Sequence, residues 1–100
     1  MSEGDALRVL TVCGVGMGSS LMLRMTTEKA LRELGVPATV EATDISSARG
    51  MSADVIIGQG MHTDELAGRA EIVLAVSNFM DTAALQAQLE AAFRQAGWIQ

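Results

Sequence analysis

The chain has 100 residues, 49% of them hydrophobic, and a formal net charge of -5 at pH 7. This length and apolar content suffice to bury one hydrophobic core, which predicts a single domain. The acidic balance argues against a nucleic-acid partner, because binding a phosphate backbone requires a basic face. The sequence has one cysteine and one histidine, which excludes an internal disulfide and leaves too few ligands for a metal site.

Neither a membrane span nor a secretion signal is evident in the sequence. No stretch reaches the roughly 18 consecutive apolar residues of a spanning helix. The start, MSEGDALR, lacks the basic residues and long apolar run of a signal peptide. We therefore expect a cytoplasmic protein that does not insert into a membrane. Residues 1–6 are expected to be frayed or disordered, and residues 7–100 to form the domain.

Four short apolar, largely β-branched runs alternate with helical patterns along the chain. The runs predict strands at residues 7–12, 38–42, 54–58 and 71–76. Short connections between alternating strands and helices are typical of an open parallel sheet with right-handed crossovers. The predicted fold class is α/β, with strand order 2-1-3-4 and helices on both faces. In this order the first strand is central, and its carboxyl end lies at the switch point where ligands bind.

The helical patterns have recognisable starts and ends. The first predicted helix covers residues 20–34 and has an apolar stripe of Leu23, Thr27, Leu31 and Leu34. Gly35 is expected to cap its end, before Pro37. Asp44 or Ser46 is expected to start a short turn, and Thr63 a short helix. Asp81 is expected to cap a last helix that ends at Gly97, with Leu85, Leu89, Ala92 and Phe93 on its apolar face.

The stretch after the first predicted strand carries the chemistry. It contains Cys13, three alternating glycines (Gly14, Gly16 and Gly18) and then Ser19 and Ser20. Glycines let backbone N–H groups approach a ligand closely, and the serines are expected to cap the following helix. Such a stretch predicts an anion cradle, because helix dipole and N–H groups point at one place. A lone cysteine is commonly a small buried apolar residue, but these surroundings favour a reactive thiolate.

Three other uses of a glycine-rich stretch fit less well. A nucleotide P-loop needs lysine before the helix-capping Ser or Thr, whereas Gly18 precedes Ser19 here. A dinucleotide fingerprint needs glycine or alanine where Ser19 stands, and a larger sheet. A cysteine-dependent phosphatase has a similar cradle but an arginine six residues after the cysteine, again at Ser19. Without that guanidinium, a phosphoryl group is expected to be held rather than rapidly hydrolysed.

The run CGVGMGSSLMLRM at residues 13–25, behind LRVLTV, resembles the phosphocysteine loop of a known family. These are the enzyme IIB proteins of the bacterial phosphoenolpyruvate-dependent sugar phosphotransferase system. The run is most similar to the L-ascorbate type, close to the lactose/chitobiose and mannitol types. DVIIG, the His62 region and AVSNFMD also fit, so the resemblance covers nearly the whole chain.

The resemblance implies a phosphotransferase that acts between two protein partners. Cys13 would accept a phosphoryl group from a phosphohistidine of a IIA protein. It would pass the group to a sugar, possibly L-ascorbate, held by the membrane IIC protein. No cofactor or metal is expected. The phosphate would be held by the backbone of Gly14, Val15, Gly16, Met17, Gly18, Ser19 and Ser20.

Two further residues are candidates for accessory roles. Arg24 lies either on a solvated face or where it attracts a phosphorylated partner. His62 lies beside the phosphate if the strand order is right, or is an ordinary surface residue. Met17 and Met22 are expected to form an apolar collar for a docking partner. A low-molecular-weight phosphatase-like hydrolase and a thiol-based regulatory module remain alternatives.

Overall fold

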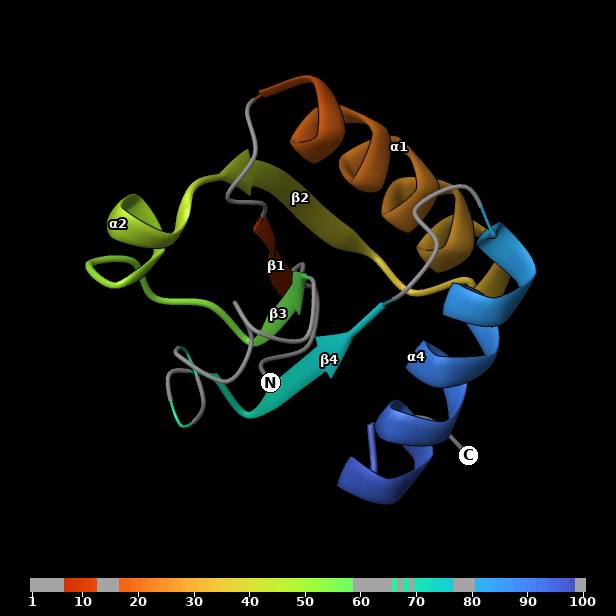
Figure 1. The fold of residues 1–100 in the computed structure, drawn as a ribbon. Coiled ribbons are helices and arrows are strands. Elements are labelled where there is room, and N and C mark those ends of the chain that lie inside the picture. Colours follow the sequence, from red (N-terminus) through yellow and green to blue (C-terminus); the bar gives the residue numbers. More distant parts are fainter. Residues whose placement is uncertain are drawn as a thin grey trace.

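Four parallel strands form one sheet at the centre of the computed structural model, which describes residues 7–12, 17–58, 66, 68, 70–76 and 81–98. For residues 17–20 it describes the backbone alone. The strand order is β2-β1-β3-β4 (Figure 1). This arrangement confirms the predicted fold class and order. The strands are β1 (Leu7–Val12), β2 (Ala38–Thr43), β3 (Val55–Gly58) and β4 (Ile72–Ala75).

Three helices among the described residues cover the two faces of this sheet. They are α1 (Met17–Leu34), α2 (Ile45–Ala48) and α4 (Thr82–Ala96). In Figure 1, α1 and α4 lie on one side of the sheet and α2 on the other. The two faces bury separate apolar clusters, one packed under α1 and α4 and one including Ala48 of α2. The prediction of helices on both faces is thereby confirmed.

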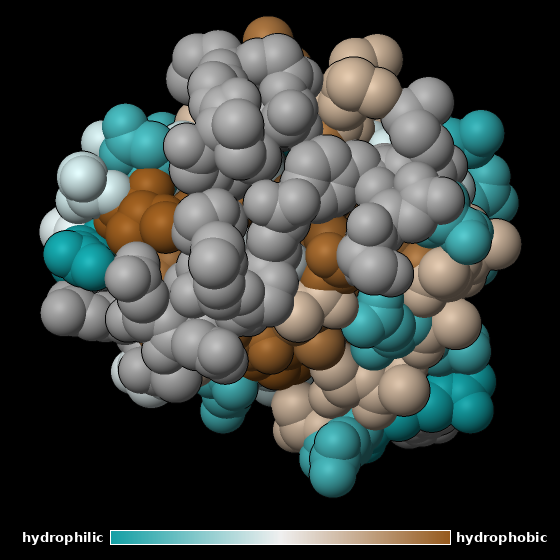
Figure 2. All heavy atoms as spheres, viewed as in Figure 1, coloured by the Kyte–Doolittle hydropathy of each residue, from teal (hydrophilic) through white to brown (hydrophobic). Residues whose placement is uncertain are grey.

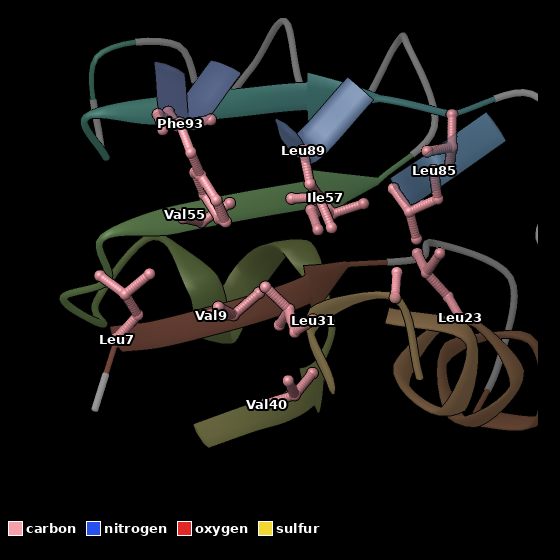
Figure 3. Close-up of a cluster of buried hydrophobic side chains, with 13 residues drawn as sticks. Leu7, Val9, Leu23, Leu31, Val40, Val55, Ile57, Leu85, Leu89 and Phe93 are labelled. Carbon is pink, nitrogen blue, oxygen red and sulfur yellow. The ribbon is translucent and has the colours of Figure 1, made fainter. Parts of the chain in front are cut away.

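Alternation along the central strands explains both clusters. Successive strand side chains point to opposite faces, so Val9 and Ile57 pack under α1 and α4, while Leu10 and Ile56 pack on the α2 side. Strands buried on both faces read as nearly continuous apolar runs, as β3 does, while β1 is interrupted by the exposed Arg8 and by the buried Thr11. Figure 3 shows the larger cluster, in which β1, β3, α1 and α4 contribute these labelled residues: Leu7, Val9, Leu23, Leu31, Val55, Ile57, Leu85, Leu89 and Phe93.

Both long helices end in the same hydrogen-bonded turn. At the end of α1, Gly35 has φ 71°, its N–H donates to the Arg32 carbonyl, and the Val36 N–H donates to the Leu31 carbonyl. At the end of α4, Gly97 has φ 80°, and the same two bonds run from Gly97 to Arg94 and from Trp98 to Phe93. This is the Schellman motif, which favours glycine at its left-handed position. Both predicted glycine caps are confirmed.

Two aspartates begin helices as predicted. The Asp44 carboxylate accepts a hydrogen bond from the Ser47 N–H at 2.7 Å. The Asp81 carboxylate accepts one from the Ala84 N–H at 3.0 Å. Each bond satisfies an N–H group that has no partner within its own helix. The predicted apolar stripes of α1 and α4 face the core as expected, with Leu34 and Ala92 partly buried and the other members buried.

The predicted start of the first helix was wrong by three residues. Because α1 begins at Met17, Ser19 and Ser20 lie inside its first turn and do not cap it. One glycine in a helix costs only about 1 kcal/mol, which the following leucine- and methionine-rich turns offset. Strand ends differ from the prediction by one residue at several places. The predicted helix capped by Thr63, together with residues 1–6 and Ile99, lies outside the described residues.

Asp54 explains why β3 begins one residue later than predicted. Its backbone N–H donates to the Arg8 carbonyl at 2.8 Å. Its carboxylate, however, accepts the Arg8 N–H, also at 2.8 Å. A side chain therefore replaces one backbone acceptor of the ladder at this point, and regular pairing starts at Val55.

Candidate functional site

One row of paired residues crosses the sheet at its carboxyl edge. Val12 pairs with Thr43 on one side and with Gly58 on the other, and Gly58 pairs with Ala75. These four are the last residues of their strands. Because Cys13 follows Val12 directly, it is joined to the central strand at the edge where ligands bind in this architecture. Residues 13–16, and with them Cys13, Gly14, Val15 and Gly16, lie outside the described residues.

The amino terminus of α1 is the next described element after Cys13 along the chain. Four residues separate the last residue of β1 from Met17, the first of α1. The first four N–H groups of a helix lack intrahelical partners, and the helix dipole is positive there. The first turn of α1 contains no acidic residue that would cancel this potential. The backbone of residues 17–20, part of the predicted cradle, is therefore suited to an anion.

A buried leucine lies near the start of each long helix, Leu23 in the second turn of α1 and Leu85 in the first turn of α4. Leu23 and Leu85 belong to one apolar cluster and lie at the same end of the core in Figure 3. Leu23 is fully buried and Leu85 is 2% exposed. Because packed side chains resist displacement, these two residues fix the starts of both helices relative to the carboxyl edge.

Arg24 lies on the exposed side of α1, paired with Glu28. Its Nε is 3.6 Å from the Glu28 Oε1, and the two side chains are 43% and 38% exposed. The two residues are one helical turn apart, at i and i+4. A surface pair of this kind contributes at most about 1 kcal/mol, so it holds the guanidinium only weakly. The pairing agrees with a solvated face, and a role toward a partner stays a prediction.

Of the other accessory candidates, only Met22 has a described side chain. His62 lies outside the described residues, although β3, which precedes it, ends in the row at Gly58. Met22 is 44% exposed, as expected for a docking collar. The Met17 side chain is not described. The description of the site therefore uses neither His62 nor the Met17 side chain.

One contact at the carboxyl edge was not foreseen from the sequence. The Gln88 side-chain amide donates to the carbonyl of Ala75 at 3.0 Å, joining α4 to the last residue of β4. Ala75 belongs to the row that ends all four strands. A glutamine on an exposed helical face gives no signal in the sequence, because any polar residue suits such a position.

The described residues show neither a metal-binding cluster nor a membrane-spanning helix. Among them, no group of three or more His, Cys, Asp or Glu side chains is placed to hold a metal ion. No helix in this part of the chain is long and apolar enough to cross a membrane.

Comparison with known proteins identifies the chain. The family model of the lactose/cellobiose-specific IIB subunit of the sugar phosphotransferase system (PTS) matches residues 8–91. The chain belongs to this family. One curated relative is the ascorbate-specific PTS system EIIB component of Mycoplasma pneumoniae (strain ATCC 29342 / M129 / Subtype 1). It is 38% identical over 82 residues, which cover 79% of this chain and 86% of that protein.

The family confirms the resemblance found at residues 13–25. The chain is a IIB component, and therefore a phosphotransferase of a sugar-transporting PTS. The matched residues 8–91 include the whole sheet and the row at its carboxyl edge. Membership of a phosphotransferase family agrees with a helix start that is suited to an anion and follows Cys13 in the sequence.

Proposed function

We propose that this IIB component carries the phosphoryl group on Cys13, between a phosphorylated IIA protein and a sugar bound by a membrane IIC protein. The observation that supports this most is the arrangement of the two described elements that flank residue 13 in the sequence, β1 and α1. The central strand ends at Val12, in the row that closes all four strands. The amino terminus of α1, free of acidic residues, begins at Met17, after four intervening residues.

The chemistry consists of two displacements at phosphorus. The Cys13 thiolate attacks the phosphorus of the phosphohistidine, an S–P bond forms, and the N–P bond breaks, so that the imidazole leaves and takes up a proton. A sugar hydroxyl then attacks the same phosphorus and loses its proton, the S–P bond breaks, and the thiolate is restored. Backbone N–H groups of residues 14–20 hold the phosphoryl oxygens in both steps.

The location and the substrate follow from the partners. A carrier that exchanges phosphate with a IIA protein works in the cytoplasm, at the inner membrane where IIC lies. We propose L-ascorbate as the sugar, supported by the name of the Mycoplasma pneumoniae relative. Pairing the protein with an ascorbate IIC and with a lactose-type IIC tests the choice, because only the matching pair should yield sugar phosphate.

Labelling with phosphorylated IIA protein tests the carrier role directly. The protein is incubated with radiolabelled donor, digested, and the labelled peptide identified by mass spectrometry. We expect the label on Cys13 and no uptake by Cys13→Ser. Ser46→Ala, at an exposed position of α2, serves as the control and should still be labelled. Label on His62 or on a serine, or undiminished uptake by Cys13→Ser, would contradict the proposal.

His62 and Arg24 are proposed as accessory residues of the same site. A protonated imidazole near the phosphate would stabilise its negative charge, so His62→Ala should shorten the lifetime of the phosphocysteine. Arg24→Gln should slow uptake from the donor without changing that lifetime. Unchanged transfer rates in both directions would make either residue a bystander.

The hydrolase alternative predicts a different activity. Because Ser19 stands where a cysteine-dependent phosphatase has arginine, p-nitrophenyl phosphate should be hydrolysed at or near background. Brisk hydrolysis at neutral pH that depends on Cys13 would favour a phosphatase. A phosphorylated protein that no IIC could discharge would instead favour the regulatory module.

A further inference from the structure

An aspartate follows β2 at the carboxyl edge, beside the strand that leads to Cys13. Val12 pairs with Thr43 in the last row of the sheet, so the residues that come next, Cys13 and Asp44, are attached to neighbouring strands at the same edge. At Asp44 the backbone is still extended, with φ -97° and ψ 172°. Asp44 therefore continues β2 beyond the row before the chain turns into α2.

Covalent geometry limits how far Asp44 can lie from Cys13. Neighbouring strands run about 4.8 Å apart, and consecutive Cα atoms are about 3.8 Å apart. Because each of the two residues is bonded to one member of the pair formed by Val12 and Thr43, their Cα atoms lie within about 12 Å of each other. The next carboxylate along β2, that of Glu41, is further from the edge, in the row of Leu10.

The Asp44 carboxylate is held in place and ionised. It accepts the Ser47 backbone N–H at 2.7 Å, and this hydrogen bond holds the pKa of Asp44 below its ordinary 3.8. Asparagine and serine cap helices as well as aspartate does, so the cap of α2 does not by itself require a charge. Asp44 is exposed, and Figure 2 shows pale and teal atoms of polar residues at the left margin, where α2 lies in Figure 1.

This carboxylate and the start of α1 act in opposite directions on an anion at residue 13. The start of a helix is equivalent to about half a positive charge and favours a phosphate. A carboxylate carries a full negative charge, which disfavours a phosphate and a thiolate alike. β3 contributes no charged residue. On the other described elements around this edge, the charged residues nearest to it along the chain are Arg24 of α1, Glu41 of β2, Arg49 after α2 and Asp81 before α4.

We propose that the Asp44 carboxylate tunes the transfer reaction through its field, by destabilising phosphorylated Cys13 relative to the free thiol. The helix start holds the phosphoryl group until the next partner arrives, and the opposing charge of Asp44 keeps the group easy to pass on. Asp44 does not touch the phosphate in this role. The inference rests on the proposed carrier function and adds a residue that sets the balance of the transfer.

Two aspartate-to-asparagine variants test the role of position. Asp44→Asn removes the charge and keeps a capping side chain. Asp54→Asn is the matched control, because the Asp54 carboxylate also accepts a backbone N–H, that of Arg8 at 2.8 Å, but lies at the opposite, amino-terminal edge of the sheet. Arg8 is about 13 Å from Val12 along β1, at ~3.3 Å per residue. Far-UV circular dichroism verifies that both variants fold.

The first measurement needs no partner protein. Iodoacetamide alkylates thiolates, and Cys13 is the only cysteine, so the pH dependence of the alkylation rate reports its ionisation. A unit charge about 10 Å away, at an effective dielectric constant of roughly 20 to 80, changes such an equilibrium about two- to tenfold. Asp44→Asn should therefore lower the midpoint pH by about 0.3–1 unit in about 10 mM salt, and by much less in about 1 M salt, which screens the charge. Asp54→Asn should lower it by at most about 0.2 unit.

The second measurement is the transfer equilibrium. The protein is mixed with a fixed ratio of phosphorylated to free IIA protein, and the phosphorylated fraction is determined by mass spectrometry. Asp44→Asn should shift the equilibrium about two- to tenfold toward phosphorylated Cys13 at low salt, and much less at high salt. Asp54→Asn should behave as the wild type.

Three results would overturn the assignment. Asp44→Asn could leave either the alkylation profile or the transfer equilibrium unchanged. Asp54→Asn could change both as much, which would indicate an effect of net charge alone. The changes in Asp44→Asn could be equally large at high salt, which would indicate an altered structure instead of a field. Failure of the wild-type protein to take up phosphate would contradict the carrier function itself, and is a separate outcome, because the alkylation profile does not depend on it.

Discussion

Phe93 and Trp98 lie ring against ring across the end of α4, with centroids 5.5 Å apart and planes inclined by 33°. The Trp98 N–H also donates to the Phe93 carbonyl at 2.8 Å. The same two residues are therefore joined through the backbone, by the Schellman turn, and through their side chains. Phe93 is fully buried and packs in the cluster between α4 and the sheet, close to Val55 in Figure 3.

We expect Phe93→Ala to lower the free energy of unfolding by about 3–5 kcal/mol, because it removes a large buried side chain and leaves a cavity. Trp98→Ala should cost less, because Trp98 is only partly buried. Urea denaturation followed by far-UV circular dichroism measures both. Exposed Gln95→Ala is the control and should change stability by less than about 0.5 kcal/mol. A larger loss for Trp98→Ala than for Phe93→Ala would contradict this account of the core.

Alanine should lower the free energy of unfolding when it replaces Gly35 and raise it when it replaces Gly50. Gly35 has φ 71°, where an L-residue costs roughly 1–2 kcal/mol. Gly50 does not have a positive φ, and a Cβ there would meet only the Ser47 carbonyl oxygen, at 3.8 Å. Gly50→Ala should therefore raise stability by about 0.4–1 kcal/mol, by restricting the unfolded chain. Thermal unfolding of the two variants decides the point, and a shift of equal sign in both would refute it.

The fold was predictable because its signals are local and repeated. Apolar runs such as VIIG in β3, the aspartates before α2 and α4, and Gly35 and Gly97 after α1 and α4 each favour one structure by themselves. Strand order followed from these elements, since parallel strands with short crossovers allow few arrangements. The start of α1 could not be found in this way. Gly18 favours a turn, while Met17 and the residues after it favour a helix, and their balance depends on the packing of Leu23.

The place of Cys13 after a central strand was predictable, because the strand order followed from the sequence, and the end of such a strand is where these folds bind ligands. Contacts that depend on tertiary packing were not. The Gln88 bond to Ala75 joins residues 13 positions apart, and no local pattern distinguishes Gln88 from other exposed polar residues. The exposure of Met25 could not be predicted either, because the sequence shows only that Met25 lies off the apolar stripe of α1.

The stability of the start of α2 should fall at low pH, because Asp44 caps this helix through its ionised carboxylate. The Ser47 backbone N–H, and then the Ser47 side chain, hydrogen-bond to its carboxylate and hold the pKa of Asp44 below the ordinary 3.8. A lowered pKa stabilises the fold above the unfolded-state pKa, and this contribution is lost as pH falls through the folded-state value. The start of α2 should therefore loosen only below about pH 3.8.

Asp44→Asn separates the cap from its charge. Asparagine also caps helices, so the variant should keep the Ser47 bond but lose its pH dependence. The chemical shift of the Ser47 amide, followed by NMR from pH 6 to pH 2, is the measurement. An Asp44→Asn variant whose Ser47 amide titrates as in the wild type would show that another group is responsible.

Phosphorylation of Cys13 should protect the first turn of α1 from hydrogen exchange. The backbone of residues 17–20 is already helical, so little conformational entropy is lost there when a phosphate is bound. Its N–H groups lack intrahelical partners, and a phosphocysteine would offer them charged acceptors. A charge-assisted hydrogen bond contributes about 1.5–3 kcal/mol, equivalent to a slowing of roughly 10- to 100-fold. Exchange in β4 should be unchanged, because β3 separates that strand from β1, the strand that precedes Cys13.

Amide exchange measured by NMR, with and without phosphorylated IIA, tests this expectation. Cys13→Ser treated in the same way is the control, because donor binding alone also covers amides. If residues 17–20 slow equally in that variant, the partner protects them and the phosphate does not. If they slow only when Cys13 is phosphorylated, the helix start is the phosphate-binding element. In that case the N–H groups that bind the phosphoryl group are already oriented before phosphorylation, because they belong to a formed helix. The first turn of α1 should then stay helical when the phosphoryl group leaves, so the same N–H groups can bind the next one.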